Sequence, residues 1–282
     1  MKFAKYQGIG NDFVMVSDPS DSISLTPALV RSLCDRRFGI GADGVIRVVP
    51  SERAHFFMDY VNSDGSPSEM CGNGVRCVAV FARAEGLTDD SRIDVDTRAG
   101  VKSAEVDGDR VRVDMGAPIF EPSEIPVALD EEGSDALRAK LELDDEVIEA
   151  AVLSMGNPHA VLFVDDASSA PVTTLGPRLE EHPAFPSKAN IEFVTVESPD
   201  RITMRVWERG ARETLACGTG ACAAAVAARL LRDTDSKLTV ALRGGDLEVQ
   251  WTGSTTDQQP VFMTGPAVEV FTGEVFTREV PI

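Results

Sequence analysis

The sequence predicts a mixed α/β fold made of two similar halves, each rich in strands around one principal helix. Three observations support this: an internal repeat, a single glycine-marked helical run in each half, and strand-like runs that follow one another. Because strands and helices do not alternate strictly, a Rossmann sheet is not expected. The expected domains are residues 1–117 and residues 118–262, with residues 263–274 returning to complete the first.

The repeat has a spacing of 146 residues, the separation between Cys71 and Cys217. The same shift aligns three further positions, which are Asn11 with Asn157, Asn62 with Glu208, and residues 44–49 with residues 190–195. Four matches in one ungapped register are improbable by chance. We therefore expect two structurally equivalent halves.

Each half contains the same kinds of element. The strand-like runs of the first half are residues 13–17, 45–49, 54–61, 92–96, 102–106 and 110–115. Those of the second half are residues 160–164, 191–196, 202–207, 238–242, 246–250 and 261–263. The principal helices are expected after Cys71 and Cys217, where small and apolar residues follow. Between the halves, three prolines and a run of acids predict a crossover with a short helix over residues 134–143.

Charge and composition exclude several classes of function. The 282 residues include 46 acidic and 27 basic ones, for a net charge of −19. This argues against binding to nucleic acid or to an anionic membrane. The sequence contains no apolar run of the roughly 18 residues that span a bilayer, and no apolar N-terminal run typical of a signal peptide. We expect a cytoplasmic protein.

Five cysteines are present, an odd number that argues against a disulfide framework, and their spacing is not that of a zinc site. Cys34, Cys77 and Cys222 are expected to pack in the core. Cys71 and Cys217 differ, because glycines follow them where a helix is expected to begin. N–H groups at a helix start bind carboxylate oxygens and lower the pKa of a thiol.

Other titratable residues are expected to be structural or solvated. His55 and His182 have no supporting motif and are assigned no role. The acidic pairs Asp165-Asp166 and Glu180-Glu181 are interpreted as solvated faces and not as metal ligands. No metal ion is therefore expected. None of the six Lys stands in an evident pyridoxal-binding motif, so no other cofactor is expected either.

Two thiols at two helix starts suit one reaction class. Inversion of a carbon next to a carboxylate requires a base on one face and an acid on the other, and an ionised and a neutral thiol can fill these roles. N–H groups of both helices would hold the carboxylate and stabilise the developing enolate-like charge. This chemistry requires that the two halves face each other, with Cys71 and Cys217 on opposite sides of one carbon.

Several motifs together resemble the diaminopimelate epimerase family. They are Gly8-Ile9-Gly10-Asn11-Asp12-Phe13, Asn62-Ser63-Asp64-Gly65-Ser66, Met70-Cys71-Gly72-Asn73-Gly74, Met155-Gly156-Asn157-Pro158-His159, Trp207-Glu208-Arg209-Gly210 and Ala216-Cys217-Gly218-Thr219-Gly220. The resemblance implies interconversion of L,L- and meso-diaminopimelate in lysine biosynthesis, without pyridoxal phosphate or metal. It also implies two pseudo-symmetric domains, each a curved, mostly antiparallel sheet around a central helix, with the active site in the cleft between them.

The resemblance also implies roles for the matching residues. Cys71 and Cys217 match the catalytic bases, while His159 and Glu208 match residues that orient or poise the thiols. The matches to N–H donors for the reacting carboxylate are Gly72, Asn73, Gly218 and Thr219. The matches to ligands of the amino and distal amino-acid groups are Asn11, Asn62, Asn157, Asn190, Glu208 and Arg209. A two-ended zwitterion needs carboxamides, a carboxylate and a guanidinium of this kind.

Two positions depart from the family pattern. Gly44 stands where many relatives have a Gln that contacts substrate, so this contact is missing or comes from the backbone. Phe271 stands where relatives often have a Tyr at a dimer contact. The resemblance still implies a homodimer, without that hydroxyl.

Three alternatives remain open from the sequence. A proline or hydroxyproline racemase also uses paired thiols, but its compact, one-ended substrate would not need so many polar ligands. A phenazine-type isomerase lacks the thiol pair. A non-catalytic amino-acid-binding protein could keep the Asn and Arg ligands, but it has no need of two thiols in register.

The charge composition predicts adaptation to high salt. The basic residues are 6 Lys and 21 Arg, and Asp alone accounts for 25 residues. A surface poor in Lys and rich in Asp suits a very salty cytoplasm, where repulsion is screened and carboxylates keep the protein hydrated. We expect the circular dichroism signal of folded protein to be lost on dialysis to low salt. Full retention of that signal would indicate an ordinary acidic protein.

Overall fold

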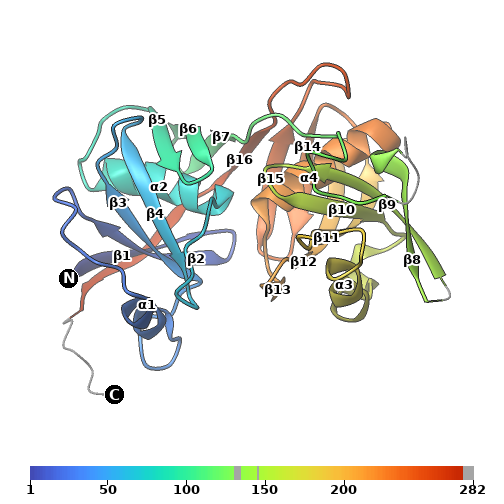
Figure 1. The fold of residues 1–282 in the computed structure, drawn as a ribbon. Helices are drawn as coiled ribbons and strands as arrows, with labels where there is room; N and C mark the ends of the chain where they lie inside the picture. Colours follow the sequence, from blue (N-terminus) through green and yellow to red (C-terminus); the bar gives the residue numbers. More distant parts are fainter. Residues whose placement is uncertain (130–134, 145, 276–282) are drawn as a thin grey trace. The chain divides into compact units, whose positions relative to one another are not determined.

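The computed structural model describes residues 1–129, 135–144 and 146–275. The chain divides into two compact units, the first formed by Met1–Val113 with Gly265–Ile282 and the second by Asp114–Thr264. Both units are mixed α/β structures dominated by strands, and the described residues contain four α-helices (Figure 1). This confirms the predicted fold class.

The first unit is a sheet with two crossover helices. Its elements are β1 (Lys2–Gly8), β2 (Asn11–Ser17), α1 (Pro27–Cys34), β3 (Gly44–Val49), β4 (Phe56–Asn62), α2 (Gly72–Ala84), β5 (Arg92–Thr97), β6 (Gly100–Asp107), β7 (Arg110–Asp114) and β17 (Val268–Glu274). Strands β2 and β3 pair in parallel, as do β4 and β5, and the other neighbours along the sheet are antiparallel. Parallel neighbours require a crossover, which α1 and α2 supply.

The second unit repeats this order. Its elements are η1 (Ala136–Arg138), β8 (Ala139–Leu143), β9 (Glu146–Ser154), β10 (Pro158–Phe163), η2 (Ala167–Ser169), α3 (Val172–Glu180), β11 (Asn190–Ser198), β12 (Arg201–Glu208), β13 (Arg212–Glu213), α4 (Gly218–Leu231), β14 (Lys237–Leu242), β15 (Gly245–Gln250) and β16 (Phe262–Pro266). The parallel pairs are β10–β11 and β12–β14, and α3 and α4 are the crossovers. Helices α1 and α3 were not predicted from the sequence.

The hydrogen-bond register also repeats between the units. The equivalent cross-strand pairs are Phe13–Gly44 and Val45–Val61 in the first unit, and His159–Asn190 and Ile191–Trp207 in the second. Each member of the second set lies 146 residues after its counterpart. The spacing found in the sequence is therefore preserved in the strand pairing, and the two units have the same internal topology.

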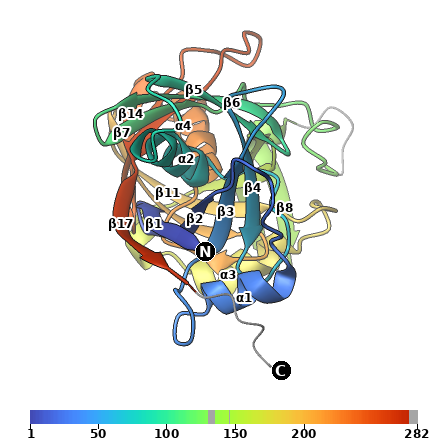
Figure 2. The same cartoon turned by 90° about the vertical axis from the view of Figure 1, so that its left-hand side faces the viewer.

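The central helix of each unit is enclosed by its own sheet. Helix α2 contacts β17 and the successive strands from β1 to β6, among which it lies in Figure 2. Helix α4 contacts β9, β10, β11, β12, β14 and β15 in the same way. Most residues of both helices are buried, and the buried ones are small or apolar except Asn73 and Arg76 of α2. The sheet therefore holds the N-terminus of each helix in place.

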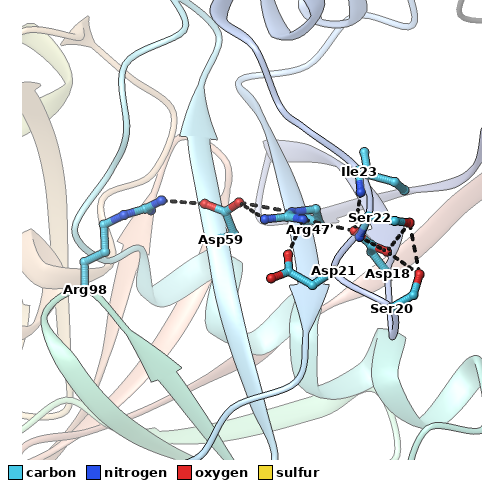
Figure 3. A network of polar contacts seen from close by, with 8 residues as sticks. All are labelled: Asp18, Ser20, Asp21, Ser22, Ile23, Arg47, Asp59 and Arg98. Atoms are coloured by element: carbon cyan, nitrogen blue, oxygen red, sulfur yellow. Dashed lines mark hydrogen bonds and ion pairs between the residues drawn. The ribbon is translucent and has the colours of Figure 1, made fainter.

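A network of ion pairs joins four parts of the first unit (Figure 3). Arg47 on β3 contacts Asp18, Asp21 and Asp59, and Arg98 in the β5–β6 turn also contacts Asp59. Burial alone raises the pKa of the Asp18 carboxyl, but backbone N–H groups and Arg47 bond to it and lower that pKa to about 2. The network therefore ties the end of β2 to β3, β4 and the turn.

The helix predicted over residues 134–143 is wrong. Ala136–Arg138 form a 3-10 turn and Ala139–Leu143 form strand β8, while Ser134 lies outside the described residues. Strand β8 pairs with β9 and buries Ala139 and Leu141 on alternate positions, a period of two that overrides the helical interpretation.

The interpretation of Glu180 as a solvated acid is also wrong. Glu180 is buried at the end of α3, where its carboxylate accepts hydrogen bonds from Trp207 Nε1 at 2.7 Å and from the Gly210 N–H at 2.9 Å. Its neighbour Glu181 is exposed and pairs with Lys188. Packing of α3 against β12 brings this carboxylate to the turn after β12.

Candidate active site

Cys71 and Cys217 each cap the N-terminus of a central helix. Both have extended backbone, and each Sγ accepts a hydrogen bond from a glycine N–H three residues later, at 3.4 Å in the first unit and 3.3 Å in the second. The first N–H groups of an α-helix have no acceptor within the helix. Those at the two positions after each thiol therefore point outward beside the sulfur. The residues concerned are Gly72, Asn73, Gly218 and Thr219.

Glycine at the third helical position allows this close arrangement. A Cβ on Gly220 would lie 2.7 Å from Glu192 Oε1 and 3.2 Å from Cys217 Sγ. A Cβ on Gly74 would lie 3.0 Å from Ile46 Cδ1. A larger residue would displace the neighbouring side chains, so the C-G-x-G motif is required by packing as well as by hydrogen bonding.

Asn11 joins the capping thiol and the helix of the first unit. Its Oδ1 accepts hydrogen bonds from Cys71 Sγ at 3.5 Å and from Asn73 Nδ2 at 3.2 Å. Its Nδ2 donates to Asp43 Oδ2 at 2.8 Å, and Asp43 is in turn paired with Arg36. Because the amide has one acceptor oxygen and one donor nitrogen, these partners determine which way it points.

Asn62 and Gly44 face each other across β3 and β4. Asn62 Nδ2 donates to Ser66 Oγ at 3.1 Å within the turn that follows β4. A Cβ on Gly44 would lie 2.4 Å from the ring carbon Cε2 of Tyr60, so no side chain is accommodated there. Any contact of Gly44 with a ligand must therefore come from its backbone.

His159 in the second unit is fully buried between two polar side chains. Its Nδ1 lies 2.7 Å from Glu192 Oε1, and its Nε2 lies 2.9 Å from Asn157 Oδ1. An oxygen atom therefore stands within hydrogen-bond distance of each ring nitrogen, which fixes the orientation of the ring. Glu192 Oε2 is buried without a hydrogen-bond partner among the described residues.

Asn190, the first residue of β11, links the paired strands β10 and β11 to the turn after β12. Its Nδ2 donates to the Pro158 carbonyl at 3.1 Å, and its Oδ1 accepts the N–H of Arg209 at 3.0 Å. The Arg209 guanidinium donates to the Ser187 carbonyl at 3.3 Å. Asn190 therefore holds the backbone that carries Glu208 and Arg209.

Glu208 and Cys217 modify each other's titration. Burial raises the pKa of the Glu208 carboxyl to about 7, and nearby Glu192 adds to this effect, although Thr214 and His159 oppose it. Burial, followed by the charges of Glu208 and Glu192, raises the pKa of the Cys217 thiol well above its ordinary value. These effects outweigh the helix start, which we expected to lower a thiol pKa. Cys217 is therefore a neutral thiol.

The structure brings most predicted residues into two groups, one in each unit. Asn11, Cys71 and Asn73 form the first group, and Asn62 lies on the segment that leads to Cys71. The second group contains Asn157, His159, Asn190, Glu208, Arg209, Cys217 and Thr219. In this group the Thr219 hydroxyl lies 3.5 Å from Cys217 Sγ.

Sequence reasoning missed two carboxylates, Glu192 and Asp43. A single acid within the apolar strand run Ile191-Glu192-Phe193-Val194 was a usable signal, because an acid in a buried strand needs a partner. Asp43, in a Gly- and Asp-rich turn, carried no such signal. The described ranges contain no group of three or more His, Cys, Asp or Glu residues able to hold a metal ion.

The remaining cysteines pack in the core, as predicted. Cys34, Cys77 and Cys222 are buried, and all five cysteines are free thiols. Burial raises the pKa of Cys34 to about 11 and that of Cys77 to about 12, so both are poor nucleophiles at neutral pH. No helix in the described part of the chain is long and apolar enough to cross a membrane.

The chain matches one family along most of its length. A model of the family described as diaminopimelate epimerase matches residues 3–121 and 151–270. A protein of Moorella thermoacetica named diaminopimelate epimerase is 49% identical over 280 residues, which cover 97% of this chain and 99% of that protein.

Solved structures with a similar fold have different names. A phenazine biosynthesis protein of the PhzF family from Bacillus anthracis has a TM-score of 0.70 and 16% identity, covering 98% of this chain and 99% of its own. A probable proline racemase from Agrobacterium radiobacter has a TM-score of 0.70 and 14% identity, covering 98% and 93%. At such low identity these two proteins share the fold alone.

The raised pKa of Glu208 predicts a pH-dependent stability. Between pH 4.5 and 7 the carboxyl ionises in the unfolded chain but stays protonated in the folded protein, so its contribution to the free energy of unfolding falls as pH rises. Chemical denaturation should show that native protein loses at most about 3 kcal/mol relative to Glu208→Gln across this interval. Glu181→Gln, at an exposed position, should show no such loss. A native-minus-Glu208→Gln difference that is flat with pH would contradict the raised pKa.

Proposed function

The chain belongs to the diaminopimelate epimerase family, and from this membership we infer that it interconverts L,L- and meso-2,6-diaminopimelate. The enzyme is an isomerase that inverts one of the two α-carbons of its substrate. We propose that it acts in lysine biosynthesis in the cytoplasm.

The observation that carries the mechanism is the pair of thiols that cap the two central helices. We propose that a thiolate removes the α-proton while the other thiol donates its proton to the opposite face of the same carbon. One sulfur takes up the proton of the C–H bond that breaks, and the other sulfur supplies the proton of the C–H bond that forms. The enzyme ends with the two protonation states swapped, ready for the reverse reaction. Proton transfer of this kind requires no cofactor.

The neutral state of the Cys217 thiol supports an assignment of roles. Cys217 acts as the acid in the direction in which Cys71 acts as the base, and the roles reverse in the other direction. Burial keeps the Cys217 proton in place, and the charge of Glu192, together with that of Glu208 once it ionises, adds to this effect. His159 remains, as predicted from the resemblance, a residue that poises a thiol.

Backbone and side-chain donors supply the remaining chemistry. N–H groups at the two helix starts, from Gly72 and Asn73 and from Gly218 and Thr219, hold the reacting carboxylate. They also stabilise the charge that develops on it when the proton leaves. The amino and distal groups bind Asn11, Asn62, Asn157, Asn190, Glu208 and Arg209. Gly44 contributes through its backbone alone.

The alternatives are not favoured. The racemase and phenazine proteins share the fold at 14–16% identity, whereas the epimerase of Moorella thermoacetica shares 49%. A binding protein without catalysis would have no need of a thiol cap on both helices.

Solvent exchange tests the reaction. Incubation of the reduced protein with L,L-diaminopimelate in deuterated water should give meso-diaminopimelate with one deuterium at the inverted carbon, measured by mass spectrometry. Cys71→Ala and Cys217→Ala should each lower the rate by about 10²–10⁴-fold, because each removes a positioned acid or base. Cys77→Ala and Cys222→Ala remove thiols from the same two helices and should keep the activity. No inversion by native protein in reducing, high-salt buffer would reject the proposed function.

We also propose a homodimer. Strand β17 pairs with β1 and leaves Val268, Val270 and Phe271 about half exposed, with Phe271 packed edge-on against Phe3. An exposed apolar strand of this kind is typical of an interaction surface. Sedimentation should show a dimer of native protein at micromolar concentration and a monomer of Phe271→Glu. A native monomer at that concentration would contradict the proposal.

A further inference from the structure

Each thiol follows a segment that begins with a proposed substrate ligand. One segment runs from Asn62 to Cys71, and the other from Glu208 to Cys217. Both start with the same turn, in which an N–H three residues later donates to the carbonyl of the ligand residue, at 2.8 Å for Asn62 and 3.1 Å for Glu208. The ligand residue and the thiol thus stand nine positions apart in the sequence of each unit.

A β-hairpin tip holds the thiol end of each segment. In the first unit the Ala99 N–H, in the turn between β5 and β6, donates to the Glu69 carbonyl at 3.2 Å. In the second unit the Gly244 N–H, in the turn between β14 and β15, donates to the Leu215 carbonyl at 2.9 Å. Both acceptors lie two residues before the thiol. The same contact therefore occurs in both copies of the repeat.

An arginine stands at the tip of each hairpin, Arg98 in the first unit and Arg243 at the equivalent position 145 residues later. Arg98 Nη1 donates to the carbonyls of Tyr60 and Ser68, both at 3.0 Å, and Nη2 contacts Asp59. Tyr60 and Asp59 belong to β4, while Ser68 belongs to the segment. The guanidinium, two-thirds buried and visible beside Asp59 in Figure 3, bridges the sheet to the segment.

In the second unit, the attachment of the segment to the sheet depends less on the arginine at the hairpin tip. Arg243 Nη1 contacts Glu213 Oε1 at 3.1 Å, and Glu213 belongs to the segment before Cys217. Arg205 on β12 also holds that carboxylate, at 2.8 Å and 2.9 Å. Glu213 therefore keeps an ion pair with the sheet when Arg243 is removed. When Arg98 is removed, Ser68 loses the side-chain bridge and keeps the backbone hydrogen bond from its N–H to the Tyr60 carbonyl at 3.0 Å.

We propose that Arg98 is a positioning residue for Cys71, which acts by holding the three residues before the thiol against β4. The inference rests on the proposed function, in which Cys71 exchanges a proton with substrate. Asn62 is held separately, by its pairing with Gly44 and its bond to Ser66. Loss of Arg98 therefore moves the thiol more than the ligand. A misplacement of about 1 Å costs on the order of 10²-fold in rate.

Kinetics test the proposal. Arg98→Met keeps the length of the side chain but removes its donors, and it should lower kcat by about 10-fold or more with a much smaller change in KM. Arg98→Lys restores the charge beside Asp59 without the double carbonyl contact and should recover part of kcat. Arg243→Met should lose less than Arg98→Met. Arg92→Met is the matched control, because Arg92 lies in the same hairpin and contacts Ser103 at 3.4 Å instead of the segment.

Thiol reactivity gives a second readout, independent of turnover. Iodoacetamide labelling followed by peptide mass mapping should show Cys71 reacting at least roughly threefold faster in Arg98→Met than in native protein, since the released segment opens more often. Cys217 should react at the native rate in the same sample. This ratio is measurable even if native protein has no epimerase activity, so failure of the proposed function and failure of the present proposal are distinguishable.

Two outcomes would overturn the proposal. One is native kcat and a native Cys71 to Cys217 labelling ratio in Arg98→Met. The other is an equal rise in the labelling of both thiols with a lowered melting temperature, which indicates general destabilisation. If Arg98→Met does not fold, the same two measurements on Arg98→Lys decide the question.

Discussion

The site depends on one constraint, the capping of an enclosed helix by a thiol. A helix buried on all sides cannot shift or rotate without disturbing the strands around it, so its first turn is held to the precision of core packing. The side chain that caps this turn is a cysteine in both units, and glycine three residues later lets the neighbouring side chains approach. The same first turn presents N–H groups to an anion. The capping sulfur and the N–H groups that can bind an anion therefore share a single rigid support.

The two copies of this support differ in the charge that surrounds them. At equivalent positions beside the third helical glycine stand Ile46 in the first unit and Glu192 in the second. The proposed ligand residues at equivalent positions are Asn62 and Glu208. Carboxylates therefore gather around Cys217, while carboxamides and an apolar side chain surround Cys71. The same backbone arrangement thus places two thiols in two different environments. This difference suits a reaction that needs one acid and one base.

The segments before the thiols likewise share their backbone contacts but differ in their charged side chains. The hairpin-tip hydrogen bond recurs in both units, but the charges that reinforce it are exchanged. Asp59 on β4 pairs with Arg98 in the first unit, whereas Arg205, at the position equivalent to Asp59, pairs with Glu213 in the second. Backbone hydrogen bonds survive duplication because they do not depend on side chains. In an ion pair, the strand residue can be the acid or the base, provided that its partner carries the opposite charge.

The sequence by itself determined the two-fold organisation, most strands, the two central helices and the capping thiols. A repeat in register and a C-G-x-G motif are local signals that need no knowledge of distant contacts. Only the tertiary structure decided the rest. Strand β8 replaced a predicted helix because β9 lies beside it, and Glu180 is buried because α3 packs on β12. Burial raises the pKa of Cys217, and Glu192, which a parallel strand pairing brings beside His159, adds to this effect. Partners such as these are far apart in the chain, so burial, charge and protonation were settled by pairing and packing instead of by local pattern.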